Sequence, residues 1–169
     1  MKHEIRRIHA NDWQELRSLR LSALAETPTA YGSSLARELE FTNNVWRERA
    51  HGAASGCTRA TFIAEDKRGW IGIATGLSEV FSEEEVVPLL VSMHVAPSAR
   101  RKGIGMALIG AVTSWARSCG AGRIALWVTS DNQSAITLYR RCAFCFTGKV
   151  RTHSRCTDLV EEEMVQKFR

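Results

Sequence analysis

Hydrophobic positions along the chain recur with two different spacings. Apolar side chains three or four residues apart predict helices, over residues 44–50, 103–119 and 132–142 and over a segment that begins at Asp12 and ends before Pro28. Asp12 followed by Glu15 has the spacing of a capping box, which would satisfy free amides at that helix start. Short alternating or wholly apolar runs bounded by turn residues predict strands, at residues 4–8, 61–65, 70–77, 86–95, 124–128, 145–150 and 159–168.

The order of these elements predicts an α/β fold with a mixed, twisted central sheet of about six or seven strands flanked by helices. A helix separates the strand at 86–95 from the strand at 124–128. The right-handed crossover rule therefore predicts that these two strands run parallel if they share a sheet. No internal repeat, low-complexity stretch or Pro/Ser-rich linker divides the sequence. We expect a single domain over residues 1–169.

Composition narrows the range of partners. The 44% hydrophobic and 24% charged residues are typical of a globular protein in water. No run approaches the roughly 18 consecutive apolar residues of a membrane span. A net charge of +5 suits an anionic ligand, but no long basic run or aromatic–basic alternation accompanies it. The sequence therefore predicts neither a membrane nor a nucleic-acid partner.

The five cysteines indicate a reducing compartment, because the number is odd and a chain of this length needs no disulfide staples. Cys142 and Cys145 form a Cys-x-x-Cys pair, yet no second pair exists to complete a zinc site. We expect structural cysteines and no metal. Residues 1–7 are charged and lack the apolar stretch of a secretory signal. Together these features predict a cytoplasmic protein.

The clearest chemical signal is the loop at residues 100–105, between the fourth predicted strand and the longest helix. Its glycines, Gly103 and Gly105, let the backbone approach a ligand without intervening side chains. Amides at a helix start have no internal partner and carry the positive end of the helix dipole, so they bind phosphate groups well. The three residues just before Gly103 are all cations, namely Arg100, Arg101 and Lys102. The loop predicts a ligand that bears pyrophosphate.

A dinucleotide-binding site is one alternative for this junction. Its Gly-x-Gly-x-x-Gly pattern would need a third glycine where this chain has Leu108, although Asp131 could serve as the ribose-binding acid. The chain is also short for that fold and offers one convincing β-α-β unit. A different ligand class fits better.

Two blocks of sequence resemble the GNAT superfamily of N-acetyltransferases. The first is Arg-x-x-Gly-x-Gly at residues 100–105, which matches the family signature Arg/Gln-x-x-Gly-x-Gly/Ala and follows a strand end at 91–97. The second is Asn-x-x-Ala-x-x-Leu-Tyr at residues 132–139, followed by Ala143 and Phe144. Family members usually carry Gly-Phe there, so Ala143 is a small departure. Together the blocks cover about residues 86–148.

The resemblance implies acetyl-CoA as the acyl donor. The strand end would bind the thioester and pantetheine arm through its backbone, the loop amides would hold the pyrophosphate, and an asparagine would bond the pantetheine amides. The residues expected to bind the cofactor are Met93, His94, Val95, Arg100, Arg101, Lys102, Gly103, Ile104, Gly105, Met106 and Asn132. Because the arm needs an entrance, we expect the two parallel strands to splay apart beyond Val95. A bulky residue at Gly105 should block the phosphate site and leave the fold nearly intact.

Tyr139 is the candidate catalytic residue. It follows Asn132 by seven residues, nearly two helical turns, so both should project from one face with Ile136 between them. A phenol with a pKa near 10 is a suitable proton donor to a departing thiolate. The structural alternative is a core tyrosine with a satisfied hydroxyl.

The predicted reaction is direct attack by an amine on the acyl-CoA thioester, with release of CoA. The acceptor is an amine-bearing small molecule or a protein amine, and the sequence does not distinguish them. Some family members place a glutamate base where this chain has Leu89, which leaves water, His94 or another acid for that role. The acidic run 83–85 could attract a cationic substrate, whereas Tyr31 and Trp46 are expected to pack in the core or loops. The alternative function is a non-catalytic acyl-CoA sensor, and the resemblance also allows a homodimer.

Overall fold

Seven strands form one mixed sheet in the computed structural model, which describes residues 3–78 and 87–168. The strand order is β1-β2-β3-β4-β5-β7-β6, and β4 runs parallel to β5 while the other described neighbours are antiparallel. The strands are β1 (Glu4–Arg7), β2 (Arg59–Asp66), β3 (Gly69–Leu77), β4 (Leu89–Val95), β5 (Arg123–Thr129), β6 (Cys145–Thr152) and β7 (Val160–Lys167). The predicted mixed α/β sheet is confirmed, and so is the parallel pairing.

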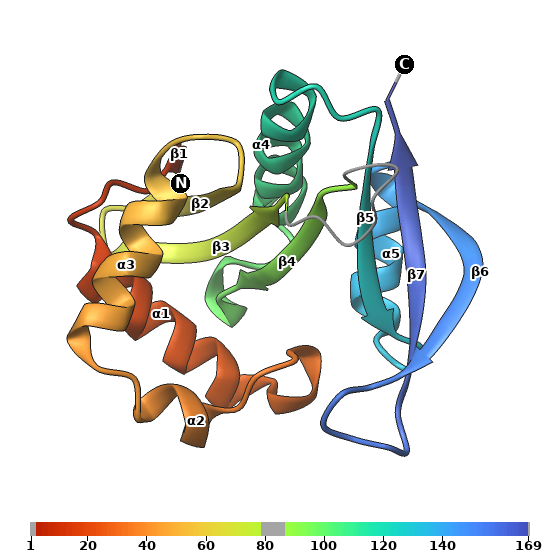
Figure 1. Cartoon of the computed structure of the whole chain (residues 1–169), viewed down its shortest axis with the longest axis horizontal. Coiled ribbons are helices and arrows are strands. Elements are labelled where there is room, and N and C mark those ends of the chain that lie inside the picture. Colours follow the sequence, from red (N-terminus) through yellow and green to blue (C-terminus); the bar gives the residue numbers. More distant parts are fainter. Residues whose placement is uncertain (1–2, 79–86, 169) are drawn as a thin grey trace.

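Helices cover both faces of the sheet, because its central strands bury alternate residues on opposite sides. In β2, Ala60 and Ala64 belong to the hydrophobic cluster of the longest helix, whereas Ile63 packs with Trp46 on the other face. The helices are α1 (Trp13–Glu26), α2 (Leu35–Leu39), α3 (Asn43–Ala54), α4 (Ile104–Ser118) and α5 (Gln133–Arg141). Figure 1 shows α1, α2 and α3 grouped at one end of the sheet, and α5 beside β5 and β7 at the other. None of the helices in the described ranges has the length and apolar character needed to cross a membrane.

The predicted capping box at the start of α1 is wrong. Asp12 does precede the helix, but its side chain makes no cap hydrogen bond. Its carboxylate accepts instead from Arg6 Nη1 at 2.7 Å and from the His9 amide at 2.9 Å. Asp12 therefore fixes the turn between β1 and α1.

Two N-terminal helices differ from the prediction. α3 extends to Ala54, four residues past the predicted end at residue 50. α2 was not predicted, because its five residues are too few to show a hydrophobic period. Its start is defined locally by Ser34, whose Oγ accepts from the Arg37 amide at 3.2 Å.

A β-bulge in β4 accompanies the separation of β4 from β5. Ser92 has φ 55°, and it lies within the register shift of the β3–β4 ladder. A bulge bends its strand and increases the local twist. The described β4–β5 ladder consists of the pair Leu89↔Ala125. The predicted splaying is therefore present, but it begins after Leu89 rather than beyond Val95.

The end of α5 has the Schellman arrangement. The Phe144 amide donates to the Tyr139 carbonyl at 3.1 Å, and the Ala143 amide donates to the Arg140 carbonyl at 3.0 Å. The rings of Tyr139 and Phe144 contact each other, with centroids 6.0 Å apart. Ala143 takes the left-handed position with φ 63°, which glycine adopts without steric cost. The departure from the family's Gly-Phe pair is thus a local source of strain.

We expect Ala143→Gly to stabilise the protein by about 0.5–1 kcal/mol, because the relief of left-handed strain exceeds the extra freedom of glycine in the unfolded chain. Urea denaturation measures the change. Ala111→Gly, in the interior of α4, is the matched control and should lose about 1 kcal/mol. A loss of stability in both variants would contradict the strain at Ala143.

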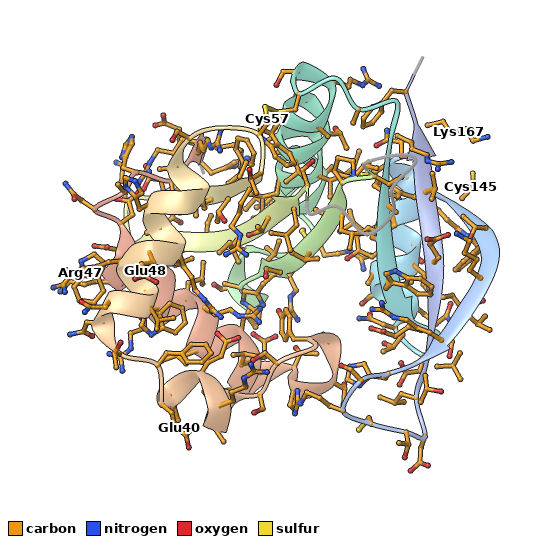
Figure 2. The ribbon with its side chains drawn as sticks, viewed as in Figure 1. Glu40, Arg47, Glu48, Cys57, Cys145 and Lys167 are labelled. Atoms are coloured by element: carbon orange, nitrogen blue, oxygen red, sulfur yellow. A yellow bond between two sulfur atoms is a disulfide. The ribbon has the colours of Figure 1, made fainter. Side chains whose placement is uncertain are left out.

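The prediction that the cysteines are unpaired is wrong for two of them. Cys57 and Cys119 form a disulfide that joins the loop after α3 to the end of α4. Figure 2 shows Cys57 next to that end of α4, and Cys145 far away on β6. The remaining described cysteines, Cys142, Cys145 and Cys156, are free thiols. Because disulfides persist in oxidising surroundings, the predicted cytoplasmic location loses its cysteine argument and stays a prediction.

Reduction of the Cys57–Cys119 disulfide should destabilise the chain by about 2–4 kcal/mol, since the bond spans 62 positions and restricts the unfolded ensemble. Thermal melts with and without a reductant measure this difference. The Cys57→Ser/Cys119→Ser variant should melt like the reduced parent and should not respond to reductant. A reductant effect that persists in this variant would show that another cysteine is responsible.

Candidate active site

A cavity of about 930 Å³ lies where β4 and β5 diverge. Its wall combines the end of β4 and the loop before α4, the segment from β5 into α5, and the N-terminal helices. Every predicted site residue except Lys102 lines this cavity. The acidic run 83–85, predicted to attract substrate, lies outside the described residues.

The backbone of β4 presents hydrogen-bonding groups to the cavity. In an antiparallel ladder, alternate residues point their backbone groups to the same neighbour. The Ala96 amide bonds to Ile71 on β3, so the groups of His94 also point toward β3, and those of Met93 and Val95 point toward β5. Since the described β4–β5 pairing does not reach them, these groups face the gap.

Side chains already occupy the carbonyls of this edge. Tyr31 donates its hydroxyl to the Met93 carbonyl at 3.4 Å, and Arg100 Nε donates to the Val95 carbonyl at 2.8 Å. The amide N–H groups of Met93 and Val95 are the donors that the edge offers to a ligand. An amide or thioester carbonyl is the matching acceptor.

The His94 side chain is buried, so it does not have the exposure expected of a base that accepts a proton from an incoming amine. It is 6% exposed, with Nε2 at 3.8 Å from Glu26 Oε2. Burial lowers the pKa of His94, and the nearby Arg100 lowers it further, while Glu26 opposes both. The imidazole is therefore neutral at pH 7.

The loop before α4 has the backbone of an anion-binding site. Arg101 and Gly103 both adopt left-handed conformations, with φ 63° and 79°. Such turns direct successive amides into one concavity, which is followed by the unsatisfied amides of the helix start. Apart from the adjacent residues, no atom of the described ranges lies within 4 Å of the position that a Gly103 Cβ would take, so the space beside Gly103 is open there.

The three cations of the loop have different surroundings. Arg100 forms an ion pair with Glu26 and also bonds Val95, so it fastens the loop to α1 and β4. Lys102 Nζ donates to the Ser98 carbonyl at 2.7 Å, and its side chain is exposed. Arg101 is exposed and has no hydrogen bond to the rest of the described chain. Arg101 is therefore the cation best placed for a phosphate.

Gly105 has a packing role that the sequence did not reveal. A Cβ at Gly105 would lie 2.9 Å from Leu138 Cδ2 and 3.3 Å from Met93 Cε. The glycine lets α4 approach α5 closely. A bulky residue there would have to displace the ends of the flexible Leu138 and Met93 side chains. The expectation that it leaves the fold nearly intact stays a prediction.

Asn132 is the N-cap of α5 rather than part of its face. Its Oδ1 accepts from the Ala135 amide at 3.2 Å and from Ser134 Oγ at 3.1 Å. The predicted two-turn relation to Tyr139 therefore does not hold, although both residues line the cavity. The Nδ2 group of Asn132 is what the side chain can still donate to a ligand.

Tyr139 lines the cavity from α5 and is 8% exposed. Burial raises the pKa of Tyr139, and the neighbouring Tyr31 and Cys142 raise it further. Its hydroxyl makes no hydrogen bond to the described part of the chain, which distinguishes it from a core tyrosine with a satisfied hydroxyl. The phenol therefore stays protonated through neutral and moderately basic pH.

The sequence prediction missed that Tyr31 belongs to the cavity. Tyr31 is 7% exposed, and burial raises its pKa to about 12. The loop that carries it is held by Arg155, whose Nη1 donates to the carbonyls of Pro28 at 3.0 Å, Tyr31 at 3.3 Å and Ser33. These contacts join segments more than 120 residues apart, so no local pattern could have revealed them.

A buried ionic cluster on the N-terminal side of the cavity was also missed. Glu38 is 1% exposed and binds Arg20 Nη2 at 2.9 Å and Arg49 Nη1 at 3.2 Å. Arg20 Nη1 also reaches Ser92 Oγ at 3.4 Å, at the β4 bulge. The cluster thus extends to the strand edge.

A family model described as acetyltransferase (GNAT) family matches residues 13–144. The chain belongs to the acetyltransferase (GNAT) family. This confirms the resemblance inferred from the two sequence blocks, and acetyl transfer is the chemistry to test first.

Two curated relatives are antibiotic acetyltransferases. The streptothricin acetyltransferase of Streptomyces lavendulae is 46% identical over 56 residues, which are 33% of this chain and 30% of that protein. The aminoglycoside N(6')-acetyltransferase type 1 of Klebsiella aerogenes is 34% identical over 65 residues, or 38% and 43% of the two chains. The matches thus span less than half the length of these relatives.

Solved structures share the GNAT fold over nearly the whole chain. A GNAT-family acetyltransferase from Streptococcus pneumoniae has a TM-score of 0.83 at 18% identity and covers 99% of this chain and 100% of its own. yncA of Salmonella typhimurium, solved with its cofactor acetyl-CoA, has a TM-score of 0.76 at 18% identity, covering 99% and 94%. Nourseothricin acetyltransferase has a TM-score of 0.58 at 29% identity and covers 65% of each chain.

We expect Arg101→Asn to weaken CoA binding about three- to fivefold, the worth of one exposed charge contact, without lowering stability. Asparagine tolerates the left-handed backbone at this position, so the change removes charge alone. Titration calorimetry at low and high salt measures the effect, which should shrink at high salt. Lys167→Gln removes a charge near the C-terminus (Figure 2) and should leave affinity unchanged. Equal losses in both variants would contradict a local contact at Arg101.

Proposed function

We propose that this protein is an acetyl-CoA-dependent N-acetyltransferase that transfers an acetyl group to an amine by direct attack and releases CoA. One observation carries the proposal. A single cavity joins the open start of α4 to the buried hydroxyl of Tyr139 through the gap between β4 and β5. Donors for phosphate, donors for a thioester arm and a proton source thus line one space.

The residues present suit the groups of CoA. The left-handed pair Arg101 and Gly103, with the first amides of α4, forms a concavity suited to pyrophosphate. The N–H groups of Met93 and Val95 suit the carbonyls of the thioester and the pantetheine arm. When bound, acetyl-CoA supplies the activated acyl group.

The chain contributes orientation and one proton. The amide of Met93 would polarise the thioester carbonyl, and Tyr139 would donate its phenolic proton to the leaving sulfur and then regain a proton from solvent. The attacking amine loses its proton to solvent, because the described glutamates that line the cavity, Glu38 and Glu161, are each paired with arginine. The His94 imidazole lies beside Glu26, with Nε2 at 3.8 Å from Glu26 Oε2.

The acceptor is a small molecule with a free amine, a class that the antibiotic acetyltransferases among the relatives support. We infer that residues 1–169 act as one catalytic domain, and the cytoplasmic location stays a prediction from the sequence. An acceptor on a protein and a homodimer stay predictions from the sequence.

Replacing Tyr139 with Phe should lower turnover by about 10- to 1,000-fold, the usual worth of a general acid. The Phe144 contact and the cofactor affinity should survive, because only the hydroxyl is removed. Since burial raises the pKa of Tyr139, the parent should show no loss of activity from ionisation of this phenol between pH 7 and about 9. Initial rates of thiol release across pH measure both effects.

A donor whose leaving thiol has a lower pKa separates acid catalysis from a packing defect. The deficit of the Phe variant should shrink with such a donor, because that thiolate needs less protonation. Loss that is equal for all donors would assign Tyr139 a structural role. Absence of thiol release with every amine, despite CoA binding, would favour a non-catalytic sensor.

A further inference from the structure

We propose that the acceptor is a small amine that also carries a carboxylate, and that the carboxylate binds at the cluster of Arg20, Glu38 and Arg49. The inference rests on the proposed acetyl transfer to an amine and names the class of that amine. The cluster lines the same cavity as Tyr139, but from α1, α2 and α3. It therefore lies on the N-terminal side, across from the loop that suits CoA.

The cluster holds two cations around one anion. Arg20 binds Glu38 through Nη2 at 2.9 Å and through Nε at 3.2 Å to the second oxygen, and Arg49 Nη1 shares that oxygen at 3.2 Å. Burial favours the neutral form of Glu38, but the hydrogen bonds from Arg20 and Ser33 and the charges of Arg20 and Arg49 outweigh it and hold its pKa below the ordinary value. The cluster thus has two cations for one anion, and the Arg20 side chain is 13% exposed and that of Arg49 is 33% exposed. A cation held partly away from water gains from an incoming anion.

The groups that remain for a ligand are donors. Arg20 Nη1 makes one long contact, 3.4 Å to Ser92 Oγ, and Arg49 uses one of its nitrogens on Glu38. The indole Nε1 of Trp46, which lines the cavity and is fully buried, has no partner in the described part of the chain. A carboxylate accepts from several donors at once, and an ammonium group offers nothing that these groups can bind.

Aromatic rings hold the two guanidinium groups in position. Arg20 lies over the ring of Tyr31 at 4.7 Å, and Arg49 lies over Phe41 at 4.6 Å and Trp46 at 5.1 Å. Such stacking fixes the plane of the guanidinium and suits it to a planar carboxylate. The site is therefore organised before the ligand arrives.

The position of Arg20 beside β4 limits the size of the acceptor. Arg20 contacts Ser92, which directly precedes Met93, the residue whose amide faces the thioester. An acceptor that touches both must carry its amine and its carboxylate a few bonds apart. Amino acids and short ω-amino acids have this spacing.

The cluster also argues against a polycationic acceptor on this side. Of the acids that line the described cavity, Glu38 is occupied by two arginines, and Glu161 is bound by Arg151 Nε at 2.7 Å. A second ammonium group would meet guanidinium groups here. The matches to antibiotic acetyltransferases cover 56 and 65 residues. They support a small amine as the class of acceptor, but they cover too little of the chain to carry the particular antibiotic to it.

The test compares matched amines in binding and in turnover. The probes are the common amino acids, β-alanine and 4-aminobutanoate, each beside its amide, in which the carboxylate charge is absent. Titration calorimetry in the presence of CoA measures binding without catalysis, and thiol release from acetyl-CoA measures kcat/KM. At least one amino acid should bind and react ten- to a hundredfold better than its amide, the usual ratio for a charge-assisted contact.

Two arginines of α3 provide the matched variants. Arg49→Gln should lower affinity and kcat/KM for the preferred amino acid ten- to a hundredfold and change the amide less than threefold. Arg47→Gln alters a side chain that points away from the cavity (Figure 2) and should change neither. Thermal melts of both variants establish that they are folded.

The results separate this inference from the proposed function. Binding of an amino acid that depends on Arg49, without thiol release, would support the carboxylate site and overturn the acetyl transfer. Turnover of amides or simple amines as fast as amino acids would overturn the carboxylate site and leave acetyl transfer supported. The carboxylate site would also be overturned if every probe acid failed to bind, or if Arg49→Gln lost as much activity with the amide as with the acid.

Discussion

The interruption of the β4–β5 ladder is the constraint on which the rest of this structure depends. Backbone N–H and C=O groups that leave water need partners, and β5 supplies none to β4 beyond the pair Leu89↔Ala125 in the described sheet. The bulge at Ser92 turns the strand, and the side chains of Tyr31 and Arg100 satisfy two of its carbonyls. What is left is a short edge of amide donors in the middle of a sheet, and a ligand with carbonyl groups completes it.

Local sequence determines the conformation of two helix ends beside this gap. The start of α4 is shaped by the left-handed residues Arg101 and Gly103, which expose amides to an anion. The end of α5 is closed by the bonds from Ala143 and Phe144, and the ring contact with Phe144 fixes Tyr139. Neither device needs a distant partner, so short stretches of local sequence can build this side of the cavity wherever the sheet opens.

The opposite side of the cavity is built from long-range side-chain contacts. Glu38 joins α1, α2 and α3 through two arginines, and Arg155 ties the β6–β7 loop to the segment that carries Tyr31. Ion pairs of this kind depend on which residues the fold brings together. The acceptor side can therefore vary in chemistry while the sheet and the loop of the GNAT fold stay the same.

The sequence by itself determined most of the elements and singled out the loop before α4, because both depend on short-range patterns. Hydrophobic period located the strands and the long helices, and the crossover rule fixed β4 parallel to β5. Glycine spacing marked the loop in which Arg101 and Gly103 are left-handed. Short-range patterns also limited what could be predicted. The helix α2 is too short to show a hydrophobic period, and Asp12 and Asn132 make local hydrogen bonds other than those expected.

Only the tertiary structure decided how these parts are used. It paired Arg100 with Glu26, 74 positions away, joined Cys57 to Cys119, and packed Gly105 against Leu138. It also placed Tyr31 and the Glu38 cluster in the cavity. Such contacts depend on the direction of side chains across a folded sheet, and a one-dimensional pattern does not contain that direction.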